Sequence, residues 1–307
     1  MKNILPVILL SFLLPISCGT ITMDDSNQSP HSSVSEDYWF QGKAEITSYK
    51  LSQARYGEIH KGTAVMVFVT ETLSKSKQVK MDDPLSNPKD AVDVLKLNLT
   101  KKFNTGIYPY SMMTSVFSPI INFSSESGKY DHALKVTTSS QEWCGHTFTQ
   151  LNQETNGYSV DNKSYFESEG DVESKIPQTW LEDELWGCLR QNPKKLPVDK
   201  FEILPSTMSL RLRHCPMAAV HAEAWFEVIE DYIEYHVQFE DDRKLIIAFI
   251  DEFPYEITGW TETYKSGFGP SAVEITTTAT KMESQMLDYW NLNDVDDSHY
   301  RKELKLD

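Results

Sequence analysis

The segment Trp143-Cys144-Gly145-His146 holds the residues of this chain best placed for covalent chemistry. Cys144 lies two residues before His146, so on a β-strand both side chains would project from the same face. An imidazole beside a thiol can hold it as the thiolate, which is the nucleophile of cysteine-dependent enzymes. This spacing makes Cys144 and His146 candidate catalytic residues. The alternative is a core cysteine beside an ordinary histidine.

Metal ligation is the second chemistry that the residue types allow. His214, Cys215 and His221 offer ligand atoms, but their spacing matches no zinc module. The acidic run 293–298 resembles a calcium loop, yet it lacks the glycine and the closing glutamate that such a loop needs, and a solvated acidic tail is the better interpretation. The sequence also has no glycine-rich phosphate loop and no Gly-x-Ser-x-Gly elbow. It therefore predicts no metal site and no cofactor.

Aromatic residues and a pair of arginines are candidate ligand-binding groups. Aromatic side chains of a β-protein mostly fill the core, although those at the mouth of a curved sheet contact ligands. Arg211 and Arg213 share one face of a strand expected over 208–213, where they could hold an anion, and ordinary surface ion pairs are the alternative. The candidate residues are Tyr108, Tyr110, Trp143, Arg211, Arg213 and Trp260.

The elements that would position these residues are mainly β-strands. Apolar and polar residues alternate over 95–99 and 233–239, which predicts antiparallel strands with one buried face. Segments 64–69 and 245–250 are apolar at every position, as in strands covered on both faces. The strongest turn signal is Asn156-Gly157, for which we expect a two-residue hairpin turn with positive φ at both positions. Further turns are expected at 82–88, 240–243 and 267–270.

One helix is predicted near 179–190. Thr179 and Glu182 have the spacing of a capping box, and Asn192-Pro193 would end the helix. With strands elsewhere, the chain is expected to be mainly β, either a large antiparallel β-sandwich or a curved, partly closed, barrel-like sheet. We expect a single β-rich domain over 37–307, with possible lobes at 37–175 and 195–307.

The N-terminus predicts export and a lipid anchor. Residues 4–16 are almost wholly apolar, as in a signal peptide, and are too few for the roughly 20 residues of a membrane span. Ser17-Cys18 directly after this run resembles the lipobox of bacterial lipoproteins, although Pro15 stands where the motif usually has leucine. The resemblance implies a signal peptide over 1–17, cleavage before a diacylated Cys18, and a flexible tether over 18–36. Cleavage before Ser17 without lipidation is the alternative.

The residue after the cysteine bears on the membrane. In enteric bacteria an aspartate in that place retains a lipoprotein in the inner membrane. Gly19 stands there in this chain, so by analogy we expect the outer membrane, with the protein facing the periplasm.

Composition excludes some function classes. Asp and Glu number 45 against 29 Lys and Arg, and the resulting net charge of −16 opposes binding to nucleic acid. The hydrophobic fraction of 40% supports a sizeable core. If Cys18 is lipidated, Cys144, Cys188 and Cys215 remain, and they allow one disulfide with a free thiol or three buried free thiols.

Five segments carry a resemblance to a known family: 38–46, 54–62, 101–111, 139–146 and 255–269. They are similar to uncharacterised lipoproteins of Bacteroidota-type bacteria, some labelled septum formation inhibitor Maf, over nearly all of 38–300. True Maf proteins are cytoplasmic α/β nucleotide pyrophosphatases with a Ser-x-Ser-Pro-Arg-Arg start. This chain has neither that motif nor an alternating β/α pattern, so the resemblance transfers no catalytic residue.

These observations predict a membrane-tethered periplasmic lipoprotein. Its β-rich body is expected to bind a lipid, a small hydrophobic ligand or an envelope protein partner. The alternative is an envelope hydrolase or thiol enzyme that uses Cys144 and His146. A nucleotide pyrophosphatase, implied by the family label, ranks last.

Overall fold

The computed structural model describes residues 37–120, 132–266 and 269–307. The predicted signal peptide, Cys18, the tether and the turn residues Gly267 and Phe268 lie outside the described residues. The strands are β1 Ala44–Arg55, β2 Glu58–Ser74, β3 Val79–Lys80, β4 Ala91–Thr105, β5 Tyr108–Pro119, β6 Lys135–Glu142, β7 Gly145–Glu154, β8 Gly157–Lys163, β9 Val172–Pro177, β10 Trp180–Leu181, β11 Asp199–Leu204, β12 Val220–Ile229, β13 Tyr232–Phe239, β14 Lys244–Phe249, β15 Ile257–Ser266 and β16 Val273–Leu287. The α-helices are α2 Glu182–Gln191, α3 Thr207–Arg213 and α4 His299–Glu303, and the short 3-10 helices are η1 Pro84–Ser86, η2 Pro193–Lys195, η3 Gly269–Ser271, η4 Tyr289–Asn291 and η5 Val295–Ser298.

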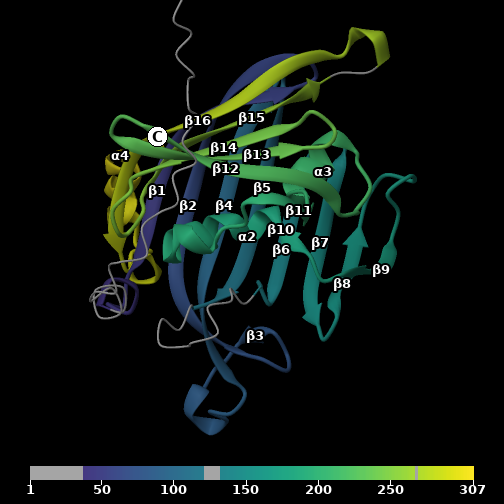
Figure 1. Cartoon of the computed structure of the whole chain (residues 1–307). Coiled ribbons are helices and arrows are strands. Elements are labelled where there is room, and N and C mark those ends of the chain that lie inside the picture. The colour runs from purple at the N-terminus through teal and green to yellow at the C-terminus, as the bar shows by residue number, and fades with distance from the viewer. Residues whose placement is uncertain (1–36, 121–131, 267–268) are drawn as a thin grey trace, which may run out of the picture. The chain divides into compact units, whose positions relative to one another are not determined.

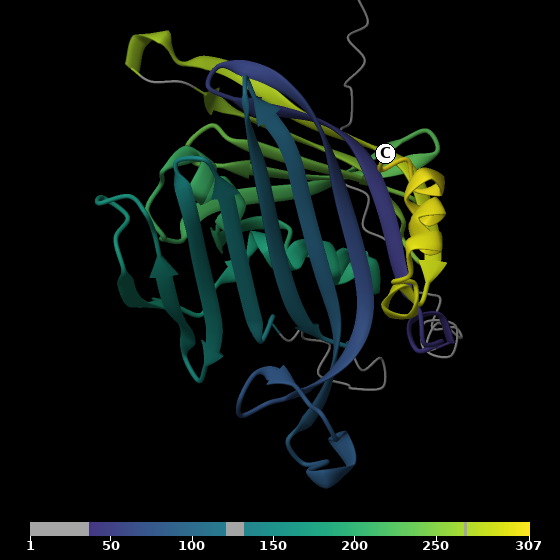
Figure 2. The same cartoon turned by 180° about the vertical axis from the view of Figure 1, so that it is seen from behind.

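These sixteen strands form one large sheet that is not closed (Figure 1). Its order is β10-β11-β12-β13-β14-β15-β16-β1-β2-β4-β5-β6-β7-β8-β9, with β3 paired to β2. Every pairing is antiparallel except that of β10 with β11. The sheet curls around α2 and α3, which lie on its concave side (Figures 1 and 2). The mainly β prediction is confirmed, in the form of a curved open sheet and not of a sandwich.

The two edges of the sheet are linked by only two residues of chain. β9 ends at Pro177 and β10 begins at Trp180. Between them, the Gln178 N–H donates to the carbonyl of Asn156 at 3.2 Å, and the Thr179 hydroxyl donates to the carbonyl of Glu202 in β11 at 2.9 Å. The edges are therefore held close together although β9 and β10 share no ladder.

The centre of the sheet is covered on both faces, as the apolar run 64–69 predicts. Ala64, Met66 and Phe68 of β2 point into the main core with α2 and α3. On the convex side Val69 packs with Leu304, just after α4, in a second small cluster. Figure 2 shows α4 lying along β1 there. The C-terminal segment thus closes over the outside of the central strands.

Helix α2 begins two residues later than the predicted capping box implies. Its N-cap is Leu181, whose N–H donates to the Glu184 carboxylate at 3.0 Å. Thr179 does not cap it, because its hydroxyl donates to β11. Residues 180 and 181 pair as β10, which delays the start of the helix. The predicted capping box of Thr179 and Glu182 is therefore wrong.

The predicted strand over 208–213 is also wrong, because Thr207–Arg213 forms helix α3. Apolar residues at 208, 210 and 212 fit a period of two, but Met208 and Leu212 also stand four apart, as on one face of a helix. A tertiary contact helps to decide between them. The Asp183 carboxylate of α2 accepts from the Thr207 N–H at 3.0 Å and from its hydroxyl at 2.7 Å, which satisfies the first turn of α3.

The turn predicted at Asn156-Gly157 lies one residue earlier. Glu154 pairs with Gly157, so Thr155 and Asn156 are the turn residues. Of the two predicted positions, only Gly157 has a positive φ, 150°. A Cβ there would lie 2.0 Å from the carbonyl oxygen of Ile176 in β9. This glycine is therefore required by the close approach of β9.

Candidate functional site

One end of the sheet gathers several turns beside the C-terminal end of α3. Antiparallel strands reverse at each turn, so turns 56–57, 106–107 and 143–144 and the loop 164–171 fall at the same end. We call this end the rim. Its residues are Arg55, Tyr56, Tyr108, Tyr110, Trp143, Phe166 and Arg211.

Three tyrosines form the centre of the rim. The hydroxyl oxygens of Tyr56 and Tyr110 are 2.9 Å apart, and the Tyr108 hydroxyl donates to that of Tyr56 at 3.3 Å. The Arg55 guanidinium lies 4.2 Å from the Tyr56 ring centroid. Partial burial raises the pKa of Tyr56, so its phenol stays protonated. The cluster combines aromatic faces with hydroxyl groups, and Tyr56 remains 43% exposed.

Trp143 extends this aromatic surface into solvent. It lies in the two-residue turn between β6 and β7, with its ring 6.4 Å from that of Tyr108, and 69% of it is exposed. An indole held out on a tight turn loses little freedom on binding, so it suits an anchor residue. The structure thus brings together Tyr108, Tyr110 and Trp143, all three of which the sequence nominates.

The candidate nucleophile Cys144 occupies the same turn. Its thiol is exposed, and its N–H donates to the Glu142 carboxylate at 3.0 Å. Hydrogen bonding and charge from Glu142 raise the pKa of the Cys144 thiol. This is opposite to the activation that a thiolate nucleophile needs. His146 lies on β7, and within the described residues no hydrogen bond joins it to Cys144.

The described cysteines are free, and they differ in exposure. Cys188 is buried in α2 and Cys215 is half-buried, whereas Cys144 is exposed. Of the two alternatives that the sequence left open, the one with three buried free thiols is right that the thiols are free, but only Cys188 is buried. The disulfide alternative is not formed among Cys144, Cys188 and Cys215.

The two candidate arginines make ion pairs. The Arg211 guanidinium lies 3.7 Å from the carboxylates of both Glu142 and Glu169, and 4.4 Å from the Phe166 ring centroid. Arg213 pairs with Asp241 in the turn between β13 and β14. These contacts are the ordinary pairs that the sequence left open as the alternative. Arg211 holds α3 to the rim, and Arg213 holds it to the turn between β13 and β14.

Trp260 lies away from the rim, in the core. It is 2% exposed, and its ring lies 4.9 Å from that of Tyr49 and 5.4 Å from that of Trp186. Trp260 of β15 therefore packs in the core between β1 and α2.

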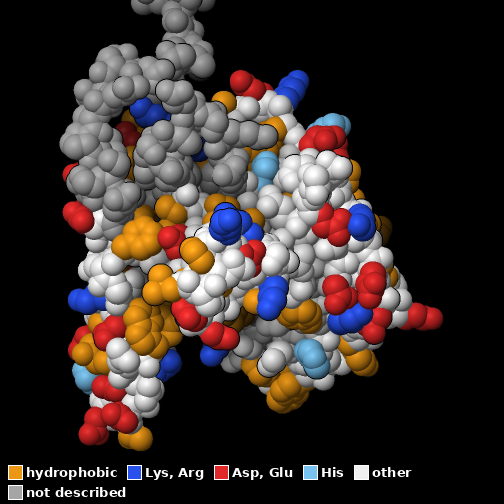
Figure 3. Space-filling view, turned by 90° about the horizontal axis from the view of Figure 1, so that it is seen from below, with side chains coloured by type: hydrophobic (Ala, Val, Ile, Leu, Met, Phe, Trp, Pro, Cys, Tyr) orange, Lys and Arg blue, Asp and Glu red, His pale blue; other side chains and the backbone are white. Residues whose placement is uncertain are grey.

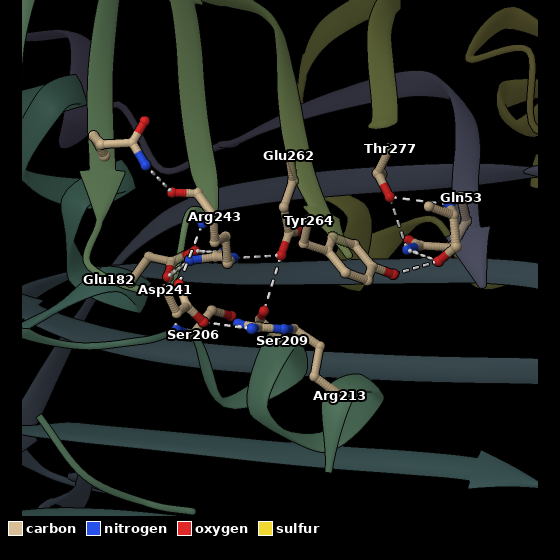
Figure 4. Close-up of polar contacts among 12 residues, drawn as sticks. Gln53, Glu182, Ser206, Ser209, Arg213, Asp241, Arg243, Glu262, Tyr264 and Thr277 are labelled. Carbon is tan, nitrogen blue, oxygen red and sulfur yellow. Dashed lines mark hydrogen bonds and ion pairs between the residues drawn. The ribbon is translucent and has the colours of Figure 1, made fainter. Parts of the chain in front are cut away.

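A buried ion network that the sequence did not reveal fixes the helices beneath the sheet (Figure 4). Arg243 donates to both oxygens of Glu182 in α2, at 2.5 and 2.7 Å, and to Glu262 in β15 at 2.8 Å. The hydroxyl of Ser209 in α3 also donates to Glu262 at 2.9 Å. Burial opposes the charge of Glu262, but Arg243 and Lys101 outweigh it and lower its pKa to about 2. Glu262 therefore stays ionised and paired with Arg243 at neutral pH, so the network holds the structure together.

A second buried pair anchors the other end of α2. Arg190 donates to the Glu45 carboxylate of β1, at 2.5 Å for its Nη2 atom, and to the carbonyl of Pro254 at 2.8 Å. Arg190 and Glu45 are 145 residues apart in sequence. Removing one partner of such a pair leaves a buried charge and typically costs about 3–5 kcal/mol.

Comparison with known proteins found no similar protein. No family model, no curated protein and no solved structure matches this chain. Within the described ranges, no helix has the length and apolarity that a membrane crossing requires.

Proposed function

We propose that this protein is a lipid-anchored binding protein of the bacterial envelope that captures a protein partner on its rim. The observation that carries the proposal is the aromatic cluster in which the exposed Trp143 and Tyr56 flank the half-buried Tyr108. The anchor would be Cys18 and the place the outer membrane, facing the periplasm, as the N-terminal sequence suggests.

The residue types of the rim favour a protein partner. Trp and Tyr, the exposed residue types of the rim, are among those most enriched at the energetic centres of protein interfaces. The concave side of the sheet, where a lipid or small hydrophobic ligand would lie, is filled by α2, all ten residues of which are buried. At the end that carries β3, by contrast, the described side chains in view include interspersed acidic, basic and hydrophobic ones, as on ordinary solvated surface (Figure 3).

The rim is tested by replacing its most exposed aromatic residue. We expect Trp143→Ala to weaken partner binding about tenfold or more while the free energy of unfolding changes by less than about 0.5 kcal/mol. The full chain carrying a photo-crosslinker at position 107, where Ile107 is 84% exposed, would first identify the partner in cells. The affinity of the purified partner is then measured for both chains.

Trp290→Ala is the matched control, since Trp290 is 44% exposed and lies in η4, outside the rim. Equal weakening by both substitutions would contradict the rim as the docking surface. A small molecule that copurifies with the full chain in native mass spectrometry would favour the small-ligand alternative. Rapid alkylation of Cys144 at neutral pH would favour the thiol enzyme.

The anchor is tested separately. The intact mass of the protein from native membranes should equal residues 18–307 with two or three acyl chains on Cys18. Cys18→Ala should lose the acyl chains, and because the cleavage precedes an acylated cysteine, it should retain the signal peptide over 1–17. An unmodified mass of the wild type, or a Cys18→Ala chain that is still cleaved before residue 18, would contradict the lipoprotein proposal and leave the rim proposal standing.

A further inference from the structure

The outer face of the hairpin β12–β13 places an imidazole and two carboxylates together. Glu227 lies directly opposite Glu234, and His236 follows on the same face of β13. The His236 Nε2 atom lies 2.9 Å from Oε2 of Glu234 and 3.4 Å from Oε2 of Glu227. One ligand atom from each residue falls within 4.8 Å of the other two. Ligand atoms around tetrahedral zinc stand about 3.3 Å apart, so this spacing is close to that of a metal centre.

The imidazole is held in place before any ligand arrives. Trp225 lies opposite His236 in the hairpin, and the two rings stack with centroids 5.0 Å apart and planes at 15°. The His236 side chain is only 13% exposed, and its Nε2 atom is buried without a hydrogen bond of good geometry. The Nε2 atom thus points at the carboxylates and is available as a ligand.

The uncompensated negative charge of Glu227 and Glu234 favours a bound cation. Two glutamates directly opposite each other in a ladder repel. The neighbours of Glu234 and His236 on β14 are Ala248 and Ile246, which carry no charge. In the part of the chain that the structure describes, no lysine or arginine pairs with Glu227 or Glu234, whose ion pairs are to His236. A divalent cation would neutralise both carboxylates and accept the Nε2 lone pair.

We propose that Glu227, Glu234 and His236 bind a divalent transition-metal ion of the Zn²⁺ type, with solvent in the fourth position. An imidazole with two carboxylates suits zinc, whereas calcium and magnesium prefer oxygen ligands alone. The site rests on a hairpin outside the rim, so it is independent of the partner proposed above. Its ligands come from both strands of the hairpin, so the ion would join β12 to β13.

The test is calorimetric titration of the full chain, stripped by a chelator, with ZnCl₂. A Cys144→Ser background removes the exposed thiol as a competing ligand. We expect one saturable site. His236→Asn and Glu234→Gln should each weaken it about tenfold or more. His221→Asn is the matched control, because His221 is an exposed histidine of the same strand β12 outside the cluster, and it should leave the affinity unchanged.

Trp225 supplies a second readout. Because its ring stacks on His236, Ni²⁺ should quench the fluorescence of the full chain, and most of that quenching should be lost in Trp225→Phe. Urea unfolding of each variant without metal shows whether it folds. Absence of a saturable site, equal weakening by His221→Asn, or unchanged affinity in a folded His236→Asn would overturn the proposal.

Discussion

At the scale of single residues, three buried acidic side chains at the start of α2 hold the helix in the interior. Glu182, Asp183 and Glu184 follow one another in the first turn of α2, and each has a different partner. Glu182 pairs with Arg243, and Glu184 accepts from the Ala133 N–H at 2.6 Å. Asp183 is bonded by Thr207 of α3 and has no ion pair with a described residue. Burial therefore raises the pKa of Asp183 to about 6, against the hydrogen bonds from Thr207.

This shift predicts a pH dependence of stability. Between about pH 4 and pH 6 the folded protein holds a proton on Asp183 that the unfolded chain releases, so stability falls as pH rises through this window. Asp183→Asn keeps an acceptor for Thr207 and removes the titration. The unfolding free energy of the variant minus that of the wild type should rise by roughly 2 kcal/mol from pH 4 to pH 7 in urea titrations. A difference that stays flat, or falls, would contradict this. Asp296→Asn is the control, because Asp296 is exposed in η5. The difference between its unfolding free energy and that of the wild type should stay constant with pH.

At the scale of elements, strands β2 and β4 approach each other closely near the rim. Gly62 of β2 is paired with Phe103 of β4, seven residues before Val69 and five after Gly57. A Cβ on Gly62 would lie 2.2 Å from the carbonyl oxygen of Lys102 and 2.8 Å from the Cβ of Phe103. On the next strand, β5, Tyr110 lies opposite Phe103, and the two rings stack with centroids 4.8 Å apart.

Gly62→Ala should therefore force the two strands apart. We expect the free energy of unfolding to fall by about 3 kcal/mol in urea denaturation, since the clash is with backbone that cannot turn away. Gly106→Ala is the control, because Gly106 has a φ of 61° but a Cβ added there would meet no atom within 4 Å, so only the left-handed backbone cost of about 1 kcal/mol applies. Equal losses would show that the strands can separate freely there.

At the scale of the whole molecule, acidic charge on the surface opposes the compact state. The net charge of −16 repels itself, whereas the pairs Arg190–Glu45 and Arg243–Glu182 are buried and shielded from salt. Surface repulsion and buried attraction should therefore respond differently to ionic strength.

Raising NaCl from about 20 mM to about 300 mM shortens the screening length from roughly 20 Å to roughly 6 Å. Repulsion between surface acids weakens, so the urea midpoint of the full chain should rise. A falling midpoint would mean that exposed ion pairs, and not net charge, dominate the electrostatics. Arg190→Met with Glu45→Met, which removes a buried pair that shares no carboxylate with another ion pair among the described residues, should leave the sign of the salt effect unchanged.

The sequence by itself determined the elements whose signal is local. Several local predictions are confirmed: the alternation over 95–99 and 233–239, the doubly covered run 64–69 and the turn 240–243. A strand with one or two buried faces requires apolar residues at regular positions, so neighbouring residues in the sequence reveal it. It also nominated Tyr108, Tyr110 and Trp143, which the structure brings together. Tyr56 was missed, although the alternation of strand direction would have placed its turn at the same end.

Only the tertiary structure decided what depends on distant residues. Segment 207–213 is a helix in which Asp183 bonds its first turn, and Trp260 is core because Tyr49 and Trp186 enclose it. Arg190 meets Glu45 across 145 residues, a pairing that no local period records. The proposed metal site is an intermediate case. Its residues, Glu227, Glu234 and His236, belong to one hairpin, so the strand register alone would place them side by side. Short-range period predicts most of the strands, whereas charge pairs and sites need the curl of the sheet to bring their parts into contact.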